Sequence, residues 1–72
     1  MTDPTLLLNG ERVELPADAT LATLLTAPPV GPLPSRGVAV AVDGTVVPRA
    51  AWAGHRLLGG ESVEVVTAVQ GG

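Results

Sequence analysis

Residues 62–72 read Ser-Val-Glu-Val-Val-Thr-Ala-Val-Gln-Gly-Gly, a run rich in valine that ends in two glycines. β-Branched residues favour extended backbone, so residues 62–69 predict a long strand. Glycine lacks a Cβ atom and tolerates most φ/ψ combinations, so Gly71 and Gly72 can enter a narrow channel and present an uncrowded carboxylate. We therefore expect residues 70–72 to form a flexible, reactive tail. The alternative is a frayed end without a function.

A β-hairpin is predicted near the amino terminus. Residues 5–8 and 12–15 flank Asn9-Gly10, a dipeptide that favours a two-residue turn because both turn positions need a positive φ. The apolar side chains of this hairpin are expected to share one face of a sheet: Leu6, Leu8, Val13 and Leu15.

A short amphipathic helix is predicted after Pro16, which ends the second strand. Thr20 is a suitable N-cap, and Leu21, Leu24 and Leu25 follow at the spacing of one helix face. A helix of this length is not stable alone, so it must dock on the sheet.

The segment 27–37 contains four of the seven prolines and predicts a stiff, extended connection. A polyproline ligand for a recognition domain is the alternative, although a plain loop is the commoner outcome for such a segment.

The second half of the chain repeats the hairpin signal. Residues 38–42 are rich in valine, Asp43-Gly44 favours a tight turn, and residues 45–47 form the return strand. Residues 49–55 predict a short turn of helix or an irregular crossover to the last strand.

These elements predict a single α+β domain over residues 1–72, in which one mixed sheet packs on one short helix. A last strand in the interior of the sheet would run parallel to the first strand through a right-handed crossover. Its carboxyl end would then project the tail clear of the domain.

Composition bounds the function. The 72 residues are 46% hydrophobic, carry a formal net charge of −3, and include neither cysteine nor lysine. The four arginines do not cluster as nucleic-acid binding requires, and disulfides and thiolate metal sites are excluded. No apolar run approaches the roughly 18 residues of a membrane span, and residues 1–4 lack the positive charge of a signal peptide. We expect a cytoplasmic protein that binds neither nucleic acid nor membranes.

Few side chains suit catalysis. His55 is the only histidine, Ser35 and Ser62 are the only serines, and their spacing matches neither a catalytic triad nor a set of metal ligands. We expect no metal site and no catalytic residue in this chain. Trp52 is the one aromatic residue and is expected in the core, with contact to a partner protein as the alternative.

The last strand has a second apolar face. Val66 and Ala68 lie on the side opposite Val63, Val65 and Val69, because side chains alternate along a strand. If no helix covers that side, the strand offers an apolar strip beside the tail. Strips of this kind mark protein contacts when they are large enough.

The carboxyl-terminal half resembles the sulfur carrier proteins of thiamine biosynthesis, the ThiS family. The resemblance rests on residues 37–42, on Val-Val-Pro-Arg at 46–49 with Trp52, and on residues 63–72. The amino-terminal half matches in layout only, through its hairpin and its short leucine-rich helix. An aspartate at Asp43, where the family often has asparagine, and a longer proline-rich loop are mild departures that leave the tail unchanged.

The resemblance implies a β-grasp, ubiquitin-like fold in which the terminal residue, here Gly72, is modified. In the family, an ATP-using ThiF-type adenylyltransferase adenylates this glycine. Sulfur from a donor such as a cysteine desulfurase relay then converts it to a thiocarboxylate, which supplies a ThiG-type thiazole synthase. The chain would be a cosubstrate rather than an enzyme and would bind no cofactor itself. The residues expected to form the tail and to contact partners are Gly71, Gln70, Val69, Ala68 and Val66.

Three other roles compete with this one. The small subunit of molybdopterin synthase is also a β-grasp sulfur carrier with a Gly-Gly end, although residues 46–49 with Trp52 favour the thiamine branch. A ubiquitin-like modifier would join its terminal glycine to a lysine of a target protein. Because this chain has no lysine, it cannot form lysine-linked chains with itself. The remaining alternative is a small binding subunit with an inert tail.

Overall fold

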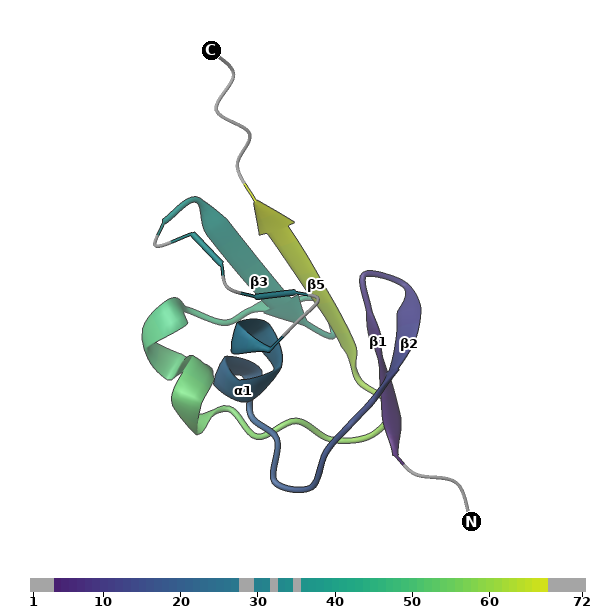
Figure 1. Cartoon of the computed structure of the whole chain (residues 1–72). Helices are drawn as coiled ribbons and strands as arrows, with labels where there is room; N and C mark the ends of the chain where they lie inside the picture. Colours follow the sequence, from purple (N-terminus) through teal and green to yellow (C-terminus); the bar gives the residue numbers. More distant parts are fainter. Residues whose placement is uncertain (1–3, 28–29, 32, 35, 68–72) are drawn as a thin grey trace.

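A five-stranded mixed sheet forms one layer of the protein, and helix α1 packs on one of its faces (Figure 1). The computed structural model describes residues 4–27, 30–31, 33–34 and 36–67. The strands lie side by side in the order β2-β1-β5-β3-β4. The predicted α+β fold, with one mixed sheet on one short helix, is confirmed. In chain order the elements are β1 (Thr5–Leu8), β2 (Glu11–Glu14), α1 (Leu21–Thr26), β3 (Val38–Val42), β4 (Thr45–Val46), the 3-10 helix η1 (Arg49–Gly54) and β5 (Ser62–Thr67).

Both predicted hairpins are present. Asn9 and Gly10, with φ angles of 50° and 85°, join β1 to β2, and Asp43 and Gly44, with 49° and 85°, join β3 to β4. Asparagine and aspartate tolerate this left-handed conformation better than most residues. Strand β4 ends one residue earlier than predicted, although the Val47 amide still donates a hydrogen bond to the Val40 carbonyl (2.8 Å).

Strand β5 lies in the middle of the sheet, as predicted. It runs parallel to β1, with Val63 opposite Leu8, and antiparallel to β3, with Thr67 opposite Val38. Strand β3 pairs along nearly the whole of β5, whereas β1 stops at Leu8. The carboxyl end of β5 is therefore held mainly by β3. Residues 68–69 of the predicted strand lie outside the described residues.

Helix α1 begins at the predicted N-cap. The Thr20 hydroxyl accepts a hydrogen bond from the Thr23 amide (3.3 Å), and the Thr23 hydroxyl accepts one from the Thr20 amide (2.8 Å). This reciprocal pair is a capping box in which threonine replaces the usual glutamate. Leu21 and Leu25 are 0% and 1% exposed, so the predicted apolar face packs against the sheet.

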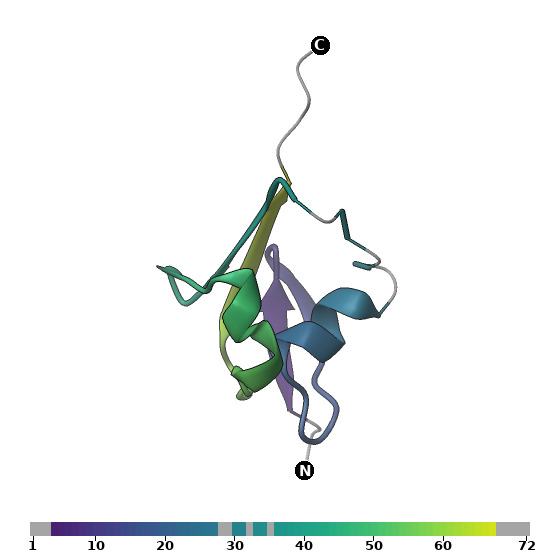
Figure 2. The ribbon, with the colours of Figure 1, turned by 90° about the vertical axis from the view of Figure 1, so that its left-hand side faces the viewer.

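The crossover from β4 to β5 contains η1, which lies beside α1 (Figure 2). Its single tryptophan, Trp52, is 6% exposed, and the indole Nε1–H donates a hydrogen bond to the Val47 carbonyl (2.9 Å). The Arg49 guanidinium lies 4.6 Å from the centre of the Trp52 ring and donates a hydrogen bond to the Pro34 carbonyl (2.7 Å). A cation stacked on an aromatic ring thus joins the crossover to the proline-rich connection.

The proline-rich connection contributes to the core. Val30 and Leu33 are half-buried against it, and the Gly31 amide donates a hydrogen bond to the Ala27 carbonyl (2.9 Å). The extended conformation predicted for this connection falls partly on residues 28, 29, 32 and 35, which lie outside the described residues.

Truncation of Leu21 tests the docking of α1. We expect Leu21→Ala to lower the free energy of unfolding by about 2–5 kcal/mol, because it leaves a cavity between the helix and the sheet. Chemical denaturation followed by circular dichroism measures this change. The same truncation at Leu58, which is 62% exposed, is the control and should change stability by no more than about 0.5 kcal/mol. Equal losses in the two variants would contradict this account of the core.

Candidate functional site

The carboxyl end of β5 is the part of the structure from which the predicted reactive tail continues. Thr67 is the last residue of β5 and of the described chain. The predicted reactive residue Gly72 and the predicted tail contacts Gly71, Gln70, Val69 and Ala68 lie outside the described residues. Their roles therefore stay predictions, and Val66 is the described residue nearest to the tail among those predicted to contact partners.

Val66 lies on a face of the sheet that neither α1 nor η1 covers, and its side chain is 62% exposed. It pairs with Ala39, and Ala41 pairs with Val46, whose side chain is 68% exposed. The alternation of side chains places all of them opposite the buried Val63. We call this surface the open face; its apolar members are Leu7, Ala39, Ala41, Val46 and Val66.

Charged side chains interrupt the open face at three points. Glu64, on β5, pairs with Ala41, and Arg12 and Glu14, on β2, pair with Leu7 and Thr5. All three are exposed. A partner that covers this face would therefore meet an apolar strip with two carboxylates and one guanidinium, which suits a protein surface better than a lipid or a nucleic acid.

Trp52 takes the core position that was expected of it. Its ring is buried and its one polar atom already donates to Val47. The alternative role, contact with a partner, stays a prediction. The stacking of Arg49 on this ring was not predicted, because Arg49 and Trp52 meet only after η1 has formed.

The isolated candidates for catalysis do not converge. His55 is half-buried, and its backbone carbonyl accepts a hydrogen bond from the Leu21 amide (3.0 Å). Ser62 is half-buried on β5, and Ser35 lies outside the described residues. Within the described part of the chain, no group of three or more His, Asp or Glu side chains could hold a metal ion, and no helix is long and apolar enough to cross a membrane.

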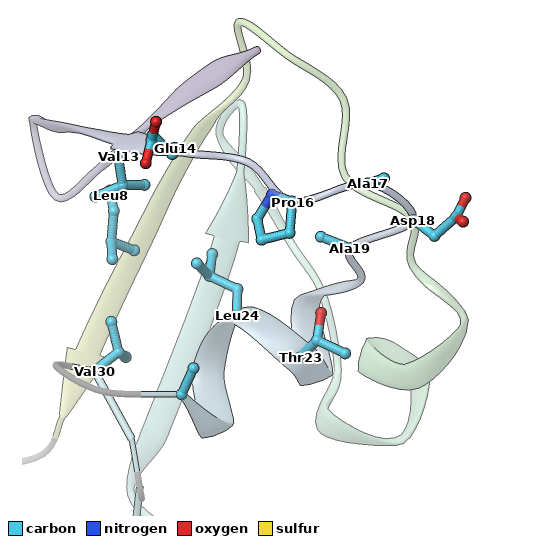
Figure 3. Close-up of a pocket in the computed structure, with 11 residues that line it drawn as sticks. Leu8, Val13, Glu14, Pro16, Ala17, Asp18, Ala19, Thr23, Leu24 and Val30 are labelled. Carbon is cyan, nitrogen blue, oxygen red and sulfur yellow. The ribbon is translucent and has the colours of Figure 1, made fainter. Parts of the chain in front are cut away.

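A hollow of about 370 Å³ lies between the first hairpin and α1 (Figure 3). Apolar side chains such as Leu8, Val13 and Leu24 point into it. Asp18 projects away from the hollow and pairs with Arg56 (3.0 Å). Without polar groups that converge on a ligand, this hollow is a gap in the packing rather than a site for chemistry.

Asn9 and Asp43, which the sequence predicts as turn residues, also bind the backbone of β5 through their side chains. The Asn9 carboxamide accepts a hydrogen bond from the Val65 amide (2.8 Å) and donates one to the Val65 carbonyl (3.4 Å). The Asp43 carboxylate accepts one from the Ser62 amide (2.9 Å). The signal for these contacts was the residue type, since Asn and Asp side chains often bind nearby backbone, but the partner strand could not be read from the sequence.

Comparison with known proteins agrees with this geometry. The model of the ThiS family matches residues 6–72. The crystal structure of a thiamine biosynthesis protein (ThiS) from Geobacter metallireducens superposes with a TM-score of 0.74 and 26% identity, over 94% of this chain and 99% of that one. No curated protein matches the sequence. The chain therefore belongs to the ThiS family, the small sulfur carriers of thiamine biosynthesis.

Proposed function

We propose that this protein carries sulfur for thiazole ring formation as a thiocarboxylate on Gly72. The observation that supports this most directly is the family match, which runs through the final Gly-Gly of the sequence. The fold is consistent with it, because the central strand β5 leads directly from the core toward that end.

The chemistry requires an activated carboxyl group. A carboxylate resists a sulfur nucleophile because oxide is a poor leaving group, whereas an acyl-adenylate expels AMP. A ThiF-type partner enzyme would supply ATP and form the adenylate at the Gly72 carboxylate. The sulfur must come from outside this chain, which has no cysteine. The chain would then act as a cosubstrate that is consumed and regenerated.

The open face is the proposed docking surface for the adenylyltransferase and for the thiazole synthase. Val66 and Val46 present apolar surface to solvent there, at 62% and 68% exposure. An enzyme that covers this surface holds the rigid body while the tail enters its active site. Binding and chemistry are thus assigned to different parts of the chain.

The family match also bears on the alternative functions. It favours the thiamine branch over the small subunit of molybdopterin synthase. A protein modifier would share the adenylation step, so the fate of the activated glycine separates it from a sulfur carrier.

Deletion of Gly72 tests the position of the reactive group. We expect the shortened protein to fold normally and to form no thiocarboxylate, because the activated carboxyl group would be displaced from the reach of the partner enzyme. Intact mass spectrometry of protein isolated from its native cells, with and without thiol alkylation, measures the exchange of oxygen for sulfur. Thiocarboxylate on the deleted chain would refute the assignment to Gly72, and wild-type chains joined to other proteins would indicate a modifier.

A charge on the open face tests the docking surface. We expect Val66→Glu to weaken binding to the adenylyltransferase about tenfold, since buried apolar contacts at the centre of an interface dominate its affinity. Isothermal titration calorimetry measures the dissociation constant. Leu58→Glu is a matched control, because Leu58 has the same 62% exposure but lies outside the open face. Equal affinities of the wild type and Val66→Glu would remove the open face from the proposal.

A further inference from the structure

The two hairpin turns bind β5 in the same way from opposite sides. Asn9 donates its backbone amide to the Val63 carbonyl (2.8 Å) and binds Val65 through its side chain. Asp43 donates its backbone amide to the Ser62 carbonyl (2.8 Å) and accepts from the Ser62 amide through its side chain (2.9 Å). Each turn residue thus continues the hydrogen bonding of its hairpin onto the central strand.

The two contacts differ in where they hold β5. Asp43 binds Ser62, the first residue of the strand, which is also paired with Leu7 of β1. Asn9 binds Val65, which lies beyond the last pairing with β1. A carboxamide carries an acceptor and a donor group, as a peptide unit does. The Asn9 side chain therefore takes the place of one residue that β1 would supply if its pairing with β5 continued beyond Leu8. On the β1 side it extends the support of β5 from Val63 to Val65.

We propose that Asn9 is a positioning residue that fixes the direction in which the tail leaves the domain. This rests on the function proposed above, because the direction matters only if Gly72 must reach an active site in a partner. Val65 is two residues from the end of β5. The hydrogen bonds between the Asn9 side chain and Val65, which we call the clamp, therefore set the twist of the strand immediately before the tail. Catalysis of adenylation depends on holding the reacting atoms in an aligned geometry.

The chain offers a matched pair of variants. Asn9→Gly removes the two side-chain hydrogen bonds to Val65, and Asp43→Gly removes the one to Ser62. Both variants keep a residue that adopts a positive φ without strain. Each also adds the same flexibility to the unfolded chain, so a general loss of stability should affect both alike. Asn9→Asp keeps an acceptor for the Val65 amide and tests rescue.

The first measurement is ATP–pyrophosphate exchange catalysed by the adenylyltransferase, well below the unfolding temperature. We expect Asn9→Gly to lower kcat about tenfold with little change in KM, since the open face is intact while the tail is misdirected. Asp43→Gly should match the wild type, and Asn9→Asp should recover most of the lost rate. An unchanged kcat in Asn9→Gly, or an equal loss in both glycine variants, would overturn the proposal.

The second measurement needs no partner. Amide hydrogen exchange and ¹⁵N relaxation should show a faster-exchanging Val65 amide and a more mobile carboxyl end of β5 in Asn9→Gly, and neither change in Asp43→Gly. Wild-type behaviour of β5 in Asn9→Gly would refute the clamp itself. If this mobility appears but the wild-type chain is never adenylated, the clamp stands and the proposed function fails.

Discussion

The structure depends on the pairing of β5 on both of its sides. This strand joins the β1–β2 hairpin to the β3–β4 hairpin, and without it the two hairpins share no sheet. Its Val63 side chain is 0% exposed and lies among the leucines of β1 and α1. A two-stranded hairpin is marginal in water, so each hairpin gains its stability from the sheet that β5 completes. The last strand of the chain is therefore also the one that makes the domain cooperative.

The two faces of this sheet have different uses. One face carries a short helix and η1, which together bury a core of leucine, valine and one tryptophan. A chain of 72 residues has too few apolar residues to cover both faces, and about 60% burial is typical at this size. The open face is the surface that remains uncovered. It keeps exposed apolar side chains, Val46 and Val66, at positions where charged side chains could have stood. Under the proposed function, this surface would be the one that the partner enzymes bind in turn.

The local signals in the sequence predicted most of the fold. Asn-Gly and Asp-Gly predicted the hairpins because these residues tolerate a positive φ. Thr20 predicted the start of the helix because its hydroxyl caps the first turn. The missed contacts include two that span large sequence separations: Asn9 to Val65, and Arg49 to Pro34. Their partners are backbone groups, which leave no trace in the sequence. The roles of the tail were predicted from the residues and the family resemblance, and residues 68–72 lie outside the described structure.

The proposed function assigns the chemistry of this chain, which has neither cysteine nor lysine, to the end of its backbone. Under that proposal, the body has two physical tasks: to be recognised by partner enzymes and to position the end of the chain. Recognition requires surface, which the open face supplies. Positioning the end of the chain requires that β5 be held on both of its edges close to its last residue, Thr67. The short β1 leaves one edge of β5 unsupported, and a single turn side chain, Asn9, supplies the support that the strand lacks.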